Sequence, residues 1–169
     1  MDLVRAIERY CAEPCCWSVG DDLSSLEWAE GNPLPKPTPE DLEAAWAECQ
    51  LDRLRQYAAG KRRSLVQGAA AINVGSRSIP TWVDPESRGA ATGLVVTLGL
   101  VPSLTAPWKG SDRQFYELAS DEIPAFALGM LQFVQSAFGV EGAVLTAIDA
   151  GTITTVEQID AAPWPQALT

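Results

Sequence analysis

Histidine is absent from this 169-residue chain, and with it the most common general base and metal ligand of proteins. The cysteines do not fill that gap, because no CxxC pair occurs and adjacent Cys15 and Cys16 cannot readily bind one zinc ion from both sides. A disulfide framework is not expected, because charged residues interrupt the first segment and leave no secretion signal. We therefore predict that Cys11, Cys15, Cys16 and Cys49 are free thiols or small buried side chains, with no metal and no cofactor bound.

Catalytic motifs are lacking as well. No G-x-S-x-G sequence occurs, and Gly60-Lys61-Arg62 fails as the end of a phosphate-binding loop, because Arg55 and Arg62 replace its Gly and Ser or Thr. Neighbouring acidic residues, which could serve a glycoside hydrolase, occupy a turn or predicted helix starts, and nothing singles one pair out. These pairs are Asp21-Asp22, Glu40-Asp41 and Asp121-Glu122. We predict that the protein is not an enzyme.

Basic side chains are outnumbered by acidic ones, 12 to 22, and the acidic excess is uneven. Residues 1–52 carry 12 acidic and 3 basic side chains, a net charge of −9, whereas residues 53–169 carry 10 acidic and 9 basic ones. Such an acidic arm repels phosphate backbones and anionic lipid, so we predict neither a nucleic acid nor a membrane as partner. The basic residues at 53–63 are interpreted as a solvated helix face or as partners of the arm.

Charge is missing altogether from residues 123–140, a stretch that reaches the lower length limit of a membrane span. It contains Pro124, Gln132, Gln135 and Ser136, so a buried core helix is the favoured interpretation.

The chain is organised around a helix predicted over residues 38–68. Prolines hold residues 32–37 as an extended strap, Thr38 offers an N-cap hydroxyl, and Pro39 fits the first helical position. Apolar residues then recur in two stripes, Leu42, Trp46 and Cys49, followed by Leu51, Leu54, Ala58 and Leu65. One helix with two packing partners is favoured; two helices with a break near Gln50 are the alternative.

Turn residues between apolar segments predict three hairpins, in residues 15–28, 71–82 and 107–118, the last two of which can join in one sheet. Pro80 confines its strand to a sheet edge or a bulge. Further helices are predicted to begin at residue 84, at Ser120 or Asp121, and at residue 155. Their expected inward residues include Leu94, Val95, Leu98 and Val101, and then Phe126, Met130, Phe133, Val134, Ala137, Phe138, Val144, Leu145 and Ile148.

These elements predict an α+β fold, with small β-hairpins packed on three to four helices. Its parts are an acidic N-terminal arm with a small hairpin and a Pro-rich strap (residues 1–37), a connecting helix (38–68) and a compact α+β domain (69–169).

Tryptophan is frequent, with six residues, and five of them lie near turns or chain ends. Burial in small satellite cores is the favoured interpretation for each, yet as a set they are candidate contacts with a partner protein. They are Trp17, Trp28, Trp82, Trp108 and Trp164. We expect the arm before Pro37 to carry the partner contact, because its hairpin cannot bury both of its own indoles. They need Trp46 of the long helix or another polypeptide.

Two segments resemble proteins of bacteriophage tails. Residues 26–50 resemble the N-terminal module of tail proteins from tailed phages and prophages, and residues 53–165 are similar to a domain of unknown function common in phage tail and tail-fibre-associated proteins. The matching residues are Ala59-Gly60-Lys61-Arg62, Ile72 to Ile79, Thr81, Asp84, Ser87, Trp108-Lys109, Phe138, Glu141, Ile148 to Thr152, Glu157, Ile159-Asp160 and Trp164-Pro165. In that pattern Thr and Asp are adjacent, whereas here Trp82 and Val83 separate them.

The resemblance implies a non-enzymatic structural component of the virion tail, made in the host cytoplasm and attached to fibre or baseplate subunits within a symmetric oligomeric assembly. A tail-fibre assembly chaperone is the alternative, followed by a cell-wall-degrading tail enzyme. The family offers no catalytic residues to transfer to this chain.

Overall fold

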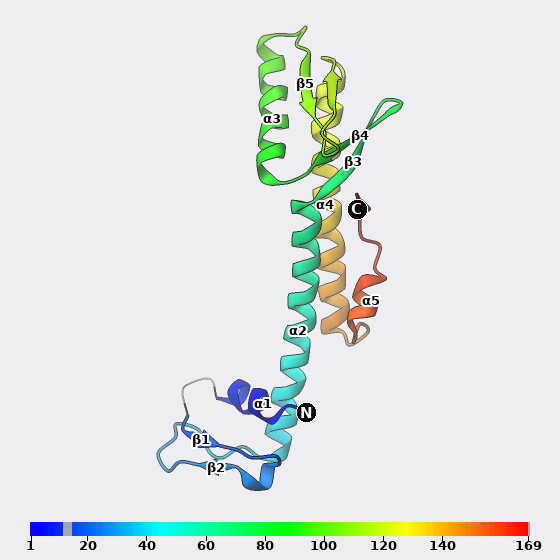
Figure 1. The fold of residues 1–169 in the computed structure, drawn as a ribbon. Coiled ribbons are helices and arrows are strands. Elements are labelled where there is room, and N and C mark those ends of the chain that lie inside the picture. Colours follow the sequence, from blue (N-terminus) through cyan, green and yellow to red (C-terminus); the bar gives the residue numbers. More distant parts are fainter. Residues whose placement is uncertain (12–14, 169) are drawn as a thin grey trace. The chain divides into compact units, whose positions relative to one another are not determined.

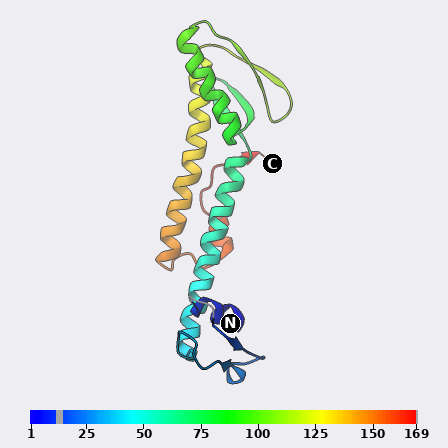
Figure 2. The same ribbon diagram turned by 90° about the vertical axis from the view of Figure 1, so that its left-hand side faces the viewer.

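A computed structural model describes residues 1–11 and 15–168 of the chain (Figures 1 and 2). The chain forms two compact units, Met1–Gln56 (unit 1) and Tyr57–Thr169 (unit 2), and the boundary falls within helix α2, Pro39–Gln67. The described residues contain five α-helices and three small antiparallel sheets, which confirms the α+β fold. The division into residues 1–37, 38–68 and 69–169 follows secondary structure rather than packing, and it stays a prediction.

Helix α2 begins where its capping residues predict. The Thr38 hydroxyl accepts a hydrogen bond from the Asp41 N–H at 3.2 Å, and the Asp41 carboxylate accepts one from the Thr38 N–H at 2.9 Å. This second bond also holds the pKa of Asp41 below its usual value. The helix then runs without interruption for 29 residues, so the alternative break near Gln50 does not occur.

Unit 1 has a hydrophobic core of its own. Helix α1 (Leu3–Tyr10) is capped by Asp2, and strands β1 (Trp17–Ser18) and β2 (Glu27–Trp28) pair antiparallel around a 3₁₀ turn, η1 (Leu23–Ser25). The buried residues are Ala6, Ile7, Leu26 and Leu42, bordered by Tyr10, Trp17, Trp28 and Trp46. The indoles of the hairpin therefore find partners on α1 and α2 inside the unit.

Hydrogen bonds fix the proline-rich strap to this core. The Trp28 indole donates to the Leu34 carbonyl at 3.1 Å, and the Tyr10 hydroxyl donates to the Pro35 carbonyl at 3.3 Å. The Lys36 ammonium donates to the Leu26 carbonyl at 2.6 Å. Since the strap and α1 cover the hairpin, the reason for expecting the partner contact on the arm does not hold.

Unit 2 contains two β-hairpins, one on each side of helix α3 (Pro85–Leu100) in the chain. Strand β3 (Ala69–Val74) pairs with β4 (Arg77–Trp82) through a tight turn at Gly75, whose φ of 59° suits glycine. The sheet has the order β4-β3-β7, with β7 at Ala167–Leu168, so β4 is an edge strand as Pro80 predicts. Strands β5 (Ala106–Lys109) and β6 (Phe115–Leu118) form a separate sheet, so the two hairpins do not join.

Three helices complete unit 2. Helix α3 (Pro85–Leu100) is capped by Asp84, and the short α5 (Val156–Asp160) has the predicted capping box of Thr155 and Gln158. Helix α4 (Glu122–Asp149) is the long central element: α3 and the second part of α2 both lie beside it (Figures 1 and 2).

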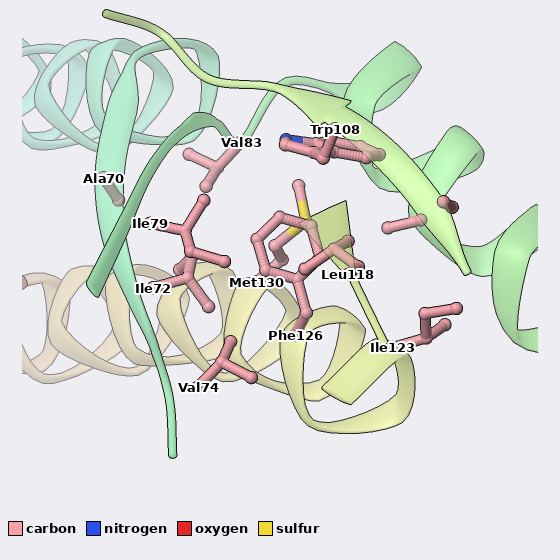
Figure 3. Packing of buried hydrophobic residues seen from close by; sticks show 12 residues of the cluster. Ala70, Ile72, Val74, Ile79, Val83, Trp108, Leu118, Ile123, Phe126 and Met130 are labelled. Atoms are coloured by element: carbon pink, nitrogen blue, oxygen red, sulfur yellow. The ribbon is translucent and has the colours of Figure 1, made fainter. Parts of the chain in front are cut away.

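The main core of unit 2 lies between the hairpins and α4. Ile72 and Ile79 from the first hairpin point toward Phe126 and Met130 of α4, and Trp108 closes the other side (Figure 3). Gly129 allows this approach, because a Cβ there would lie 2.6 Å from Ile72 Cγ2. Three residues expected to face inward are instead exposed, namely Val95, Val101 and Phe138.

The start of α4 also differs from the prediction. Asp121 makes no side-chain cap. The Glu122 carboxylate instead accepts a hydrogen bond from the Ala119 N–H at 2.9 Å and one from the Arg77 guanidinium at 2.6 Å. These two donors, the backbone N–H first, hold the pKa of Glu122 below its usual value.

A folded-state pKa lowered in this way stabilises the protein above the unfolded pKa and loses that contribution as the pH falls through the folded pKa. Glu122→Gln should therefore be less stable than wild type at neutral pH, and the difference should disappear as the pH falls through the lowered pKa of Glu122. Urea unfolding of both proteins across this range measures it. A difference that stays constant with pH would contradict the proposed linkage.

Leu42→Ala should open a cavity in the core of unit 1 and destabilise that unit by about 2–5 kcal/mol. Because Leu42 belongs to the core cluster of unit 1, the amides of α1 should lose hydrogen-exchange protection while those of β3 keep theirs. Equal losses in both elements would show that the two units unfold together.

Candidate interaction surface

Trp108, a predicted partner contact, is a core residue. Its indole N–H donates to the buried Thr81 hydroxyl at 2.8 Å, and its ring packs edge-on against Phe126 with 4.9 Å between ring centroids (Figure 3). The Thr81 hydroxyl in turn donates to the Trp82 carbonyl. Trp108 therefore offers a partner almost no surface, which agrees with burial as the favoured interpretation of each tryptophan and corrects its place among the candidate contacts.

Trp164 is buried in the same way. Its indole donates to the Ile159 carbonyl at 2.8 Å, and the Lys61 ammonium lies 5.8 Å from the ring centroid. The Tyr57 hydroxyl donates to the Asp160 carboxylate at 2.9 Å, and Lys61 forms an ion pair with the same carboxylate. Trp164 thus holds the C-terminal segment against the rest of unit 2. Its prediction as a partner contact is corrected.

The other three predicted contacts keep some exposure. Trp17 and Trp28 are half-buried at the edge of the unit 1 core, where they face each other across the hairpin. Trp82, at the end of edge strand β4, is 47% exposed. Of the five tryptophans, Trp82 is the one that fits a surface contact best.

Another apolar surface lies in unit 2, on α3 and α4. A groove of about 490 Å³ runs between these two helices. Val95, Leu128 and Leu131 line it, and the two leucines are 52% and 49% exposed. We call these residues, with Val96 and Leu100, the α3–α4 surface.

The α3–α4 surface continues over the outer side of α3. Val96 is 65% exposed and Leu100 is 81% exposed, one helical turn apart. The sequence signal for this surface is the lack of charge in residues 89–108 and 123–140. Sequence reasoning assigned the second of these stretches to the core alone, because periodicity does not reveal which lines of an apolar helix remain uncovered.

One cation lines this apolar groove. The Nε atom of Arg88 is buried without a hydrogen-bond partner, and among the described residues its side chain forms no ion pair. Thr92, the neighbouring hydroxyl, already donates to the Arg88 carbonyl at 2.9 Å. The groove therefore combines apolar walls with an unpaired guanidinium.

Comparison with protein families places this surface inside a matched segment. Residues 40–163 match the model of a family described as a domain of unknown function, DUF4376. The chain belongs to the DUF4376 family. The match begins at the first turn of α2 and ends after α5, so it includes both helices of the groove. A search of curated proteins found no match, and a search of solved structures found none either.

Three of the basic residues at 53–63 form structural ion pairs, namely Arg55, Lys61 and Arg62. Arg62 forms an ion pair with Glu141 at 3.0 Å, and its guanidinium lies 4.7 Å from the Phe138 ring centroid. Arg55 pairs with Asp52 at 2.9 Å. The pairs of Lys61 and Arg62 tie α2 to α5 and α4 within unit 2, rather than to the acidic arm.

Side chains suited to metal binding do not gather in the part of the chain that the structure describes. No group of three potential metal-ligating side chains occurs there. Burial, followed by the neighbouring Cys15 thiol, raises the pKa of Cys11 to about 11, which keeps this thiol out of its nucleophilic form at neutral pH. The predictions that the protein has no metal, cofactor or catalytic activity stay predictions.

Helix α4 meets the length and composition criteria for a membrane span, with 28% of its most apolar window buried. It is the one helix among the described residues that does so. The buried side chains of α4 pack on the hairpins, on α3 and on Val66 of α2, which is the packing expected of a core helix. Its other side carries the exposed leucines of the groove together with exposed Gln132 and Gln135.

Trp108→Ala should lower the free energy of unfolding by about 3–5 kcal/mol, because it empties a core site and leaves Thr81 without its donor. Trp82→Ala should cost less than about 1 kcal/mol, because that ring is half in solvent. Urea unfolding followed by far-ultraviolet circular dichroism measures both. Similar losses for the two variants would contradict the assigned positions.

Proposed function

We propose that this protein is a non-enzymatic structural component of a bacteriophage tail, attached to fibre or baseplate subunits through the α3–α4 surface. The single observation that carries the attachment is the exposed apolar groove between α3 and α4. The phage tail as its location rests on the sequence resemblance, because the DUF4376 description leaves the function open.

The physical support for attachment is the free energy stored in an uncovered apolar surface. Burying apolar area is worth about 25 cal/mol per Å², and full burial of a Leu or Val side chain contributes about 1.5–3 kcal/mol. Monomeric proteins rarely expose large contiguous apolar patches, whereas interface cores are depleted in charge. The α3–α4 surface exposes several neighbouring apolar side chains, and the residues that make it carry no charge.

The same features favour a protein over other partners. Net negative charge opposes binding to phosphate backbones and anionic lipids. Helix α4 packs its buried line on other elements of unit 2, and its exposed side carries amide groups that hydrocarbon would not solvate. We therefore propose neither a nucleic acid nor a membrane as partner, and a symmetric tail assembly as the setting.

The test is the composition of purified particles from a phage or induced prophage that encodes this chain. Mass spectrometry should find the protein at a fixed copy number per particle. Its absence from particles, despite good expression in the infected cells, would favour the assembly chaperone. Peptidoglycan release by the purified protein would favour the cell-wall-degrading enzyme.

A matched pair of variants links incorporation to the surface. Leu128→Asp places a charge on the groove and should reduce incorporation at least about tenfold, since a carboxylate strongly opposes burial. Phe115→Asp makes the same kind of change at an exposed site on β6 and should leave incorporation unchanged. Circular dichroism and urea unfolding check that both variants fold. Normal incorporation of Leu128→Asp would exclude the α3–α4 surface as the attachment site.

A further inference from the structure

The α3–α4 groove holds one charged group among apolar walls. Arg88 lines it together with Val95, Ala127, Leu128, Met130 and Leu131. No acid of the described chain pairs with Arg88, and its Nε–H is hidden from water without an acceptor. This arrangement is unfavourable in the free protein, because an unsatisfied buried donor loses its bond to water and gains none in return.

The chemistry of the guanidinium defines which partner group would satisfy the unpaired Nε–H of Arg88. Arginine presents a planar fork of donors that matches a carboxylate, and charge-assisted bonds of this kind are the stronger class. The rest of the groove accepts apolar side chains. A partner segment that fits both must carry one carboxylate surrounded by apolar residues.

The shape of the site favours a helix as that segment. The groove lies between two helices, and a third helix can place side chains at positions i, i+3, i+4 and i+7 into it. On such a helix an Asp or Glu at one of these positions would reach Arg88, while its neighbours cover Val95, Leu128 and Leu131.

Charge complementarity argues against a second copy as the occupant. Residues 89–108 and 123–140, which include the exposed apolar positions of α3 and α4, contain no acid. The exposed apolar positions of a second copy would therefore bring no carboxylate of their own to Arg88.

We propose that the α3–α4 groove binds an amphipathic helix of another protein, which places an Asp or Glu carboxylate on Arg88 and apolar side chains on Leu128 and Leu131. This inference rests on the proposed function, since it specifies the partner of the same surface. It adds a chemical signature by which the partner segment can be recognised.

The probe is a library of helical peptides, randomised at four positions of one face and selected on the full-length chain, with Leu131→Asp as the counter-selection target. Enriched peptides should combine apolar residues with one Asp or Glu. The best peptide is then made as a matched pair that differs only by Glu or Gln, or by Asp or Asn, at the acidic position. Affinities are measured by fluorescence anisotropy.

The acidic peptide should bind wild type at least about tenfold more tightly than its amide partner, as expected for a buried bond to a charged group. Arg88→Gln should remove this difference, and Arg88→Lys should retain part of it. Arg63→Gln makes the same charge change at an exposed site of α2 and should leave the difference intact. Enrichment of peptides without an acid, no enrichment at all, or equal binding of the acidic peptide to Arg88→Gln would overturn the proposal.

Sedimentation analysis of the free chain tests the alternative occupant. A dimer that Leu128→Asp dissociates and Phe115→Asp does not would assign the groove to a second copy and overturn the proposal.

The proposed function can fail separately. If the groove selects acidic helices while the protein is absent from particles, the tail assignment fails; if particles contain the protein while the groove selects none, the partner chemistry fails.

Discussion

Unit 2 depends on a single line of side chains along one helix. Phe126 and Met130 of α4 hold both hairpins and α3, and Val134 and Ala137 hold the end of α2. Because every partner lies on that line or beside it, the rest of an apolar helix stays uncovered. The core and the proposed attachment surface thus lie on two sides of one helix, and the lack of charge in residues 123–140 suits both.

Local features of the fold could be predicted from the sequence because their causes are local. Thr38, Asp84 and Thr155 cap helices through side-chain bonds to backbone groups three residues away. Gly75 marks a tight turn through its backbone freedom, and Pro80 marks an edge strand because it lacks an N–H. Each depends on a few neighbouring residues, which the sequence displays directly.

Features that depend on distant partners could not be predicted in this way. Trp108 packs in the core, where Thr81, 27 residues earlier, accepts a hydrogen bond from its indole N–H, and no local pattern of the sequence indicates that bond. At the start of α4, Glu122 rather than Asp121 makes the side-chain hydrogen bonds, and one of its donors is Arg77 of β4. The groove likewise arises from the spacing between α3 and α4. Its sequence signal was two uncharged stretches, which a buried helix would also show.

The proposed binding face is apolar apart from Arg88, and this has consequences for how an assembly would respond to its surroundings. Salt screens exposed ion pairs, but apolar contacts persist at any ionic strength, and a carboxylate shielded in the groove on Arg88 would be screened little. Apolar burial weakens on cooling instead. An attachment made through α3 and α4 would therefore persist at both low and high salt concentrations, and low temperature would be the condition that weakens it.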